Sequence, residues 1–218
     1  MSQLQIDYYC DVLCVWAWIA QRRLQELREE WGDQIELRFH YLPIFCDVES
    51  RIQDKWSAKS GYEGFGRHVL EASAPYELAP VNRDVWKYVR PKTSSNAHLL
   101  LKAAQISHVD VDLQALTQTI QGAFFEGQLD IGLIENVLLL MKQKGLDETK
   151  LKSSLNDGSA MAALMQDYQQ AHELNIKGSP TFIMNSGRQE LFGNVGYRIL
   201  SANIKEILDK PQHQASWC

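Results

Sequence analysis

Cys14 is the residue of this sequence best placed to do chemistry, because a strand-like segment precedes it and a helical one follows. Residues 3–10 alternate and are rich in strand formers, whereas residues 16–31 repeat apolar side chains at every third or fourth position. The free N–H groups and the dipole of a helix start favour a negative charge. We therefore expect the pKa of the Cys14 thiol to be lowered and its thiolate to act as a nucleophile. The alternative is a small, buried cysteine that only fills the junction.

The chain has four cysteines, and their spacing excludes several kinds of site. There is no Cys-x-x-Cys pair, and no cluster of histidines and cysteines has the spacing of a zinc site. We therefore expect no metal, no structural disulfide framework and mostly reduced thiols. The four residues are Cys10, Cys14, Cys46 and Cys218.

Length and composition limit the class of protein. The 218 residues suit one domain, or one domain with a large insertion, and 45% hydrophobic residues can form a core. A net charge of −5 and a pI near 5.7 provide no basic surface, so we expect no nucleic acid partner. No run of about 18 apolar residues is present, so we expect no membrane span. The first residues lack a secretory signal, and we expect a cytoplasmic protein if the chain begins at its natural start.

The elements around Cys14 predict how it is positioned. Residues 34–42 alternate strictly and form a second strand, so strand, helix and strand follow one another with short links. Such a unit has parallel strands, which brings residues 42–46 to the same sheet edge as Cys14. Near the C-terminus, residues 180–185 and 189–192 predict a hairpin around the turn at 185–187, and residues 197–208 predict a closing helix.

Between these parts the sequence predicts helices alone, separated by prolines and glycines. Asp130 and Asp147 each precede a helical run and are candidate N-caps. The predicted helices cover residues 67–73, 96–107, 113–125, 133–144, 148–155 and 160–174. The order of elements predicts an α/β protein with a thioredoxin-like core, βαβ followed by ββα, split by a helical insertion. We assign residues 1–46 and 175–210 to the thioredoxin-like domain, 47–174 to the insertion and 211–218 to a C-terminal tail.

Two motifs resemble a known family. The segment 11–19, Asp-Val-Leu-Cys-Val-Trp-Ala-Trp-Ile, resembles the D-x-x-C-P-W-C turn of the DsbA-like thioredoxin superfamily, which includes FrnE-like oxidoreductases. It is also similar to the D-V-L-S-P-Y-S-W turn of kappa-class glutathione transferases and 2-hydroxychromene-2-carboxylate isomerases. The segment 178–182, Gly-Ser-Pro-Thr-Phe, resembles the family's G-V-P-T-F with its cis-proline. Weaker similarities lie at residues 93–98, 124–125 and 130–131.

The departures from the family pattern determine which chemistry the resemblance implies. Ala17 occupies the position of the family's second cysteine, and Val15 replaces the proline after the nucleophile. The resemblance therefore implies a thiol–disulfide oxidoreductase that acts with Cys14 alone, since Ala17 cannot attack a mixed disulfide. A glutathione-dependent transferase or isomerase, with Cys14 in place of serine, is the first alternative. The second is a non-catalytic redox-sensing or thiol-binding module.

The resemblance also implies substrate contacts. Ser179, before a cis-Pro180, would present its backbone to an extended peptide or to glutathione, and Trp16 lies beside Cys14. Asn194 lies in a turn similar to the L-F-G-S-D stretch that binds the glutamyl end of glutathione in kappa transferases. Val195 replaces the acidic residue of that stretch, which leaves the usual glutathione contacts incomplete. We expect no tightly bound cofactor, with glutathione as a candidate co-substrate and small thiols, disulfides or protein disulfides as partners.

Three auxiliary roles stay open at this stage. Cys10 or Cys46 could resolve a Cys14 adduct, although Cys10 is expected to lie too far along its strand, and both have a purely structural alternative. His98 matches the family's helix start and could partner the thiolate, or it could be a structural histidine. The oligomeric state is not determined. Aromatic residues that could line an apolar cleft between the two lobes are Trp16, Trp18, Phe45, Trp56, Trp86, Phe124 and Phe125.

Overall fold

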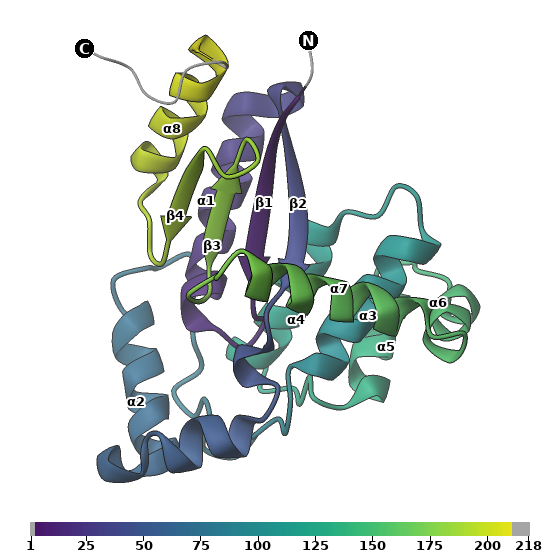
Figure 1. The fold of residues 1–218 in the computed structure, drawn as a ribbon. Coiled ribbons are helices and arrows are strands. Elements are labelled where there is room, and N and C mark those ends of the chain that lie inside the picture. Colours follow the sequence, from purple (N-terminus) through teal and green to yellow (C-terminus); the bar gives the residue numbers. More distant parts are fainter. Residues whose placement is uncertain (1–2, 211–218) are drawn as a thin grey trace.

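The computed structural model describes residues 3–210 and contains a four-stranded sheet with the order β2-β1-β3-β4. Strand β1 (Leu4–Cys10) pairs in parallel with β2 (Ile35–Tyr41) and antiparallel with β3 (Thr181–Met184). Strand β3 pairs antiparallel with β4 (Gln189–Phe192). The predicted parallel unit, the C-terminal hairpin and the α/β thioredoxin-like fold class are thus confirmed (Figure 1).

Helices cover both faces of the sheet, so the central strand β1 is buried on both sides. Helix α1 (Val15–Trp31) and helix α8 (Tyr197–Asp209) pack with the main core, which receives Tyr8 from β1. On the opposite face, Tyr9 and Ile183 pack against Ala171. Ala171 belongs to α7 (Ser159–Glu173), which crosses the sheet near the carboxyl end of β1 (Figure 1).

The segment between β2 and β3 is helical, as predicted. Its bounds agree closely with the sequence prediction, except that α2 begins at Gly61 and residues 50–54 form a π-helical turn. The assignment of domain boundaries stays a prediction. No helix within residues 3–210 is long and apolar enough to cross a membrane. The remaining helices are α2 (Gly61–Ser73), α3 (Ser95–Ser107), α4 (Leu113–Phe125), α5 (Ile134–Gln143) and α6 (Glu148–Asn156).

One of the two predicted N-caps is correct and the other is wrong. Asp147 caps α6 by accepting hydrogen bonds from the N–H groups of Thr149 and Lys150. Asp130 does not cap α5, because its Oδ1 accepts the N–H of Gly132 at 2.9 Å in a local turn. The helix begins only at Ile134, without a side-chain cap. Asp side chains form such local turns as readily as caps, which explains the error.

A buried polar network fixes the helices to strand β2. The Asp167 carboxylate on α7 accepts Lys102 Nζ of α3 at 2.7 Å and the N–H of Tyr41 at 2.9 Å. It also contacts His40 Nδ1 at 3.1 Å, while His40 Nε2 lies 2.9 Å from Asp7 Oδ1 on β1. Hydrogen bonds with these carboxylates raise the pKa of His40, although burial alone would lower it. The imidazole thus links β1 and β2 to the helical segment.

Candidate active site

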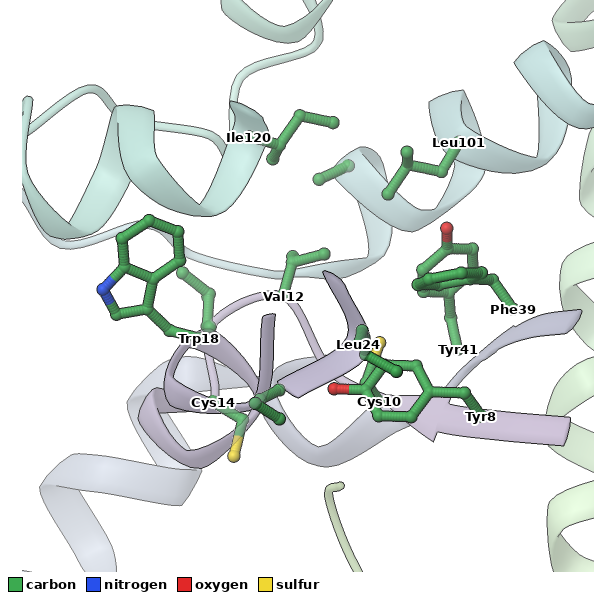
Figure 2. Close-up of a cluster of buried hydrophobic side chains, with 14 of the residues drawn as sticks. Tyr8, Cys10, Val12, Cys14, Trp18, Leu24, Phe39, Tyr41, Leu101 and Ile120 are labelled. Carbon is green, nitrogen blue, oxygen red and sulfur yellow. The ribbon is translucent and has the colours of Figure 1, made fainter. Parts of the chain in front are cut away.

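Cys14 lies beyond the carboxyl end of β1, at the start of α1, as predicted. Cys14 is the N-cap residue of this helix, and its carbonyl oxygen accepts the N–H of Trp18 at 3.0 Å. Its N–H donates to the carbonyl oxygen of Asp11 at 3.0 Å, which closes the turn between strand and helix. The side chain is only 8% exposed and lies at the margin of the hydrophobic core (Figure 2).

The second motif packs against the first. The Ser179–Pro180 peptide bond is cis, which confirms that prediction. The Cys14 Sγ atom donates to the carbonyl oxygen of Ser179 at 3.3 Å, and Ser179 Oγ accepts the N–H of Asp11 at 3.0 Å. The carbonyl oxygen of Pro180 accepts the N–H of Gly193 at 2.8 Å, which joins this loop to the β4–α8 turn. The chain thus brings together two motifs that lie 165 residues apart.

The predicted lowering of the Cys14 pKa is wrong for this structure. Burial raises the pKa of the Cys14 thiol above its usual value. The Ser179 side chain and the N–H of Ala17 oppose this effect, and the nearby Asp11 charge adds to it. The loss of thiolate hydration raises the pKa of Cys14 more than the N–H groups at the helix start lower it. In this closed arrangement Cys14 is therefore a protonated donor.

Asp11 organises the site, and the sequence analysis missed it. Its side chain is fully buried, and its Oδ1 accepts the N–H of Leu13 at 2.9 Å. Its Oδ2 accepts both the N–H of Phe45 and the hydroxyl of Ser94 at 2.8 Å. Burial raises the pKa of Asp11 to about 6, although these hydrogen bonds favour the carboxylate. The position of Asp11 three residues before Cys14 could have indicated a role in the site. The sequence does not show, however, that the donors Phe45 and Ser94 lie beside Asp11 in the fold.

His98 is structural and makes no hydrogen bond with Cys14 within the described residues. Its Nε2 accepts the N–H of Val12 at 3.2 Å, and its ring stacks on Tyr41 at a centroid distance of 4.9 Å. Burial lowers the pKa of His98 to about 3, so the ring is neutral. The 3.8 Å separation from Asp11 Oδ1 therefore does not form an ion pair. His98 fixes the backbone of the turn and does not partner the thiolate.

The other described cysteines do not contact the Cys14 sulfur. Cys10, Cys14 and Cys46 are all free thiols. Cys10 is fully buried among the core side chains, and Figure 2 shows the Cys14 sulfur pointing away from them. Burial raises the pKa of Cys10 well above its usual value, which makes it a poor attacking group. Cys46 is exposed beyond the end of β2, and Cys218 lies outside the described residues.

The remaining candidates separate into core and surface residues. Trp16 is half-buried at the edge of the core beside Cys14. Asn194 lies near the site, but its Nδ2 donates to the hydroxyl of Tyr76 at 2.7 Å. The expected aromatic cleft is mostly core, since Trp86 packs on Phe124 at a centroid distance of 4.8 Å. Its buried members are Trp18, Phe45, Trp86, Phe124 and Phe125.

Comparisons with known proteins agree with this geometry. A family model described as DSBA-like thioredoxin domain matches residues 5–205. The ClpXP adapter protein SpxH of Halalkalibacterium halodurans is 25% identical over 218 positions, covering 97% of this chain and 70% of SpxH. The cytosolic disulfide reductase DsbM of Pseudomonas aeruginosa matches with a TM-score of 0.71 and 19% identity, covering 93% of this chain and 99% of DsbM. A 2-hydroxychromene-2-carboxylate isomerase matches with a TM-score of 0.68 and 15% identity, covering 97% and 100%. At these identities the structural matches establish the fold alone.

Proposed function

Because this chain belongs to the DSBA-like thioredoxin domain family, we propose that it is a thiol–disulfide oxidoreductase in which Cys14 is the single active-site cysteine. The observation that carries the proposal is the contact of Cys14 Sγ with the Ser179 carbonyl oxygen at 3.3 Å, beside a cis-proline and at a helix start. Ala17 is fully buried one turn into the same helix, at the position of the family's second cysteine.

The proposed reaction has two steps. The Cys14 thiol loses its proton, and the thiolate attacks one sulfur of a disulfide R–S–S–R, forming Cys14–S–S–R and releasing R–S⁻, which takes up a proton. A second thiol R′–SH then attacks the sulfur of R in this mixed disulfide. That step releases R–S–S–R′ and returns the Cys14 thiol. Glutathione is the co-substrate we propose for R′–SH.

The closed arrangement of the thiol implies an opening step. The Cys14 thiol donates a hydrogen bond to the Ser179 carbonyl oxygen and is almost excluded from solvent. A peptide-like substrate offers an N–H donor of its own for that carbonyl oxygen, which frees the sulfur. Once exposed, the thiolate regains hydration and keeps the N–H groups of the helix start, both of which stabilise the anion. Substrate arrival and thiol activation are thus coupled in the proposed mechanism.

Turnover with a small disulfide tests this function. We expect the protein to catalyse exchange between 2-hydroxyethyl disulfide and glutathione, with Cys14→Ser inactive and Cys10→Ser nearly unchanged. Equal activity of Cys14→Ser would reject the assignment. A glutathione-dependent transferase or isomerase would bind glutathione without an adduct on Cys14.

A non-catalytic protein-binding role is the second candidate, because Cys14 is buried and its pKa is raised. The sequence relative SpxH carries the name of an adapter protein, although it is only 25% identical. In that case the fold would present a surface to another protein, and the thiol would not turn over. Wild-type protein without exchange activity in any thiol–disulfide pair, but with an intact fold, would favour this role.

A further inference from the structure

A cavity of about 490 Å³ lies between helix α2 and residues 83–90 of the segment that follows it. Small-molecule sites measure about 300–1,000 Å³, so this cavity can hold a complete small ligand. Its two walls are in direct contact, since a Cβ atom added at Gly66 of α2 would lie 2.7 Å from the carbonyl oxygen of Val85. Figure 1 shows the chain after α2 running beside this helix. None of the residues that surround Cys14 lines the cavity.

The lining of the cavity is positively charged, although the chain as a whole is acidic. Four cationic side chains and two carboxylates line the cavity, a net charge of +2, whereas the chain carries −5. Glu63 pairs with Arg67 at 3.4 Å. Asp84 lies 3.3 Å from Lys87 and 3.7 Å from Arg83. Two positive charges thus remain in excess, and a cavity with charge of one sign attracts ligands of the opposite sign.

The fourth cation, Arg90, is held in place by the fold and keeps its outer donors free. Its Nε donates to the carbonyl oxygen of Trp86 at 3.1 Å, and its guanidinium carbon lies 4.4 Å from the Tyr62 ring centroid. Within residues 3–210 the two Nη groups make no hydrogen bond, and the side chain forms no ion pair. Two such groups form the fork that binds two oxygens of one anion.

The backbone at Trp86 orients the carbonyl group that holds Arg90. Trp86 has a φ of 63°, a left-handed conformation that is rare for a bulky side chain. Its ring is fully buried and packs on Phe65 and Phe124 at centroid distances of 5.5 and 4.8 Å, which holds the turn in this conformation. Strained backbone of this kind clusters at ligand sites, where the surrounding structure maintains it. The turn therefore points to the cavity beside it as a binding site.

We propose that this cavity binds a small organic phosphate monoester, independently of the reaction at Cys14. A phosphate monoester carries about two negative charges at neutral pH, which matches the two excess positive charges. Arg90 binds two of the phosphate oxygens through its Nη groups, and Lys87 adds a point charge. The organic part lies against the apolar lining residues Leu70 and Val85. A sulfate ester or a monocarboxylate would leave one excess charge without a partner.

Titration calorimetry at low salt, where charges are least screened, measures this binding directly. We expect the wild type to bind phenyl phosphate about tenfold more tightly than phenyl sulfate, which has a similar shape and one negative charge. Arg90→Gln and Lys87→Gln should each weaken the binding of phenyl phosphate by about tenfold, the loss expected for one charged hydrogen bond. Lys87 is exposed, so its replacement leaves the core intact if Arg90→Gln fails to fold. Arg198→Gln is the matched control, because Arg198 is exposed on α8 and does not line the cavity.

Several results would overturn the proposal. They are the absence of binding by the wild type, wild-type affinity in folded Arg90→Gln or in Lys87→Gln, and an equal loss in Arg198→Gln. Inorganic phosphate that binds as tightly as phenyl phosphate would contradict the role of the apolar wall. Tighter binding of phthalate than of phenyl phosphate would assign the cavity to dicarboxylates. A phosphotyrosine peptide that binds tenfold more tightly than phenyl phosphate would assign it to a protein partner instead of a small molecule.

Discussion

The Cys14 sulfur and the Ser179 carbonyl oxygen are 3.3 Å apart, so the Cys14 thiol donates to the backbone acceptor beside the cis-proline. With this contact made, the carbonyl oxygen has no place for a substrate donor, and Cys14 is only 8% exposed. In the proposed mechanism, Cys14 must therefore leave this carbonyl oxygen before it can react. The predictions below follow from this closed arrangement and from the residues that hold it.

Cys14 should be less reactive than Cys46 in the absence of substrate. Burial raises the pKa of the Cys14 thiol, whereas Cys46 is exposed. Alkylation by iodoacetamide at pH 7 to 9, followed by peptide mass spectrometry, measures both residues in one sample. Faster labelling of Cys14 than of Cys46 would show that the closed arrangement is not the dominant one in solution.

Replacement of Asp11 should change the pH profile of Cys14. The pKa of Asp11 is about 6, and its charge raises the pKa of Cys14. In the wild type the rise of Cys14 alkylation with pH should therefore slow near pH 6, where Asp11 ionises. Asp11→Asn should remove this inflection and speed alkylation at pH 8 by up to about tenfold, the effect of one pKa unit.

A structural role of Asp11 alone would give a different outcome. Loss of hydrogen bonds to Phe45 or Ser94 would open the site and change the rate at every pH by a similar factor. Ser94→Ala serves as the control, since it removes one of these hydrogen bonds and keeps the charge. An unchanged inflection in Asp11→Asn would exclude the electrostatic role.

His40 should make stability depend on pH near neutrality. Its folded-state pKa is raised by Asp167 and Asp7, so its protonated form stabilises the fold. This contribution is complete below the unfolded pKa of about 6.5 and is lost as pH rises through the higher folded value. Urea unfolding should show about 1 kcal/mol less stability after this loss. His40→Gln should flatten this dependence, and an equally steep profile in that variant would contradict it.

A second thiol at position 17 should convert the protein into a dithiol enzyme. Ala17 lies in the first turn of α1, and its N–H reaches the Cys14 side chain. A cysteine there would lie within disulfide reach of Cys14. Ala17→Cys should raise insulin reduction with dithiothreitol by about tenfold or more, since the adduct is then resolved internally. Ala17→Ser is the size-matched control and should stay as weak as the wild type.

The local elements were predictable because short-range patterns determine them. Helix α4 and strand β4 begin and end where the apolar periodicity indicated, and the cis bond followed from the family motif. The family assignment followed from the same two motifs. These features depend on neighbours within a few residues.

The electrostatics of the site could not be predicted from the sequence. The Cys14 pKa depends on burial by segments far along the chain, and burial acts against the helix start. Asp11 gains its role only because Phe45 and Ser94 donate to it. His98 matched a motif, yet folding turned its acceptor nitrogen toward Val12 instead of the sulfur. Tertiary contacts of this kind leave no periodic signal.

The central claim is that Cys14 acts alone, and an intact-mass spectrum after incubation with glutathione disulfide tests it most directly. We predict that a glutathione adduct forms on Cys14 faster than on the exposed Cys46, because glutathione disulfide opens the site in the proposed mechanism and iodoacetamide does not. The Cys14 adduct should persist without added thiol and disappear when glutathione is added. Cys14→Ser should show no such adduct. An internal disulfide that joins Cys14 to Cys10 or Cys46, or an adduct that is lost without any second thiol, would contradict the account.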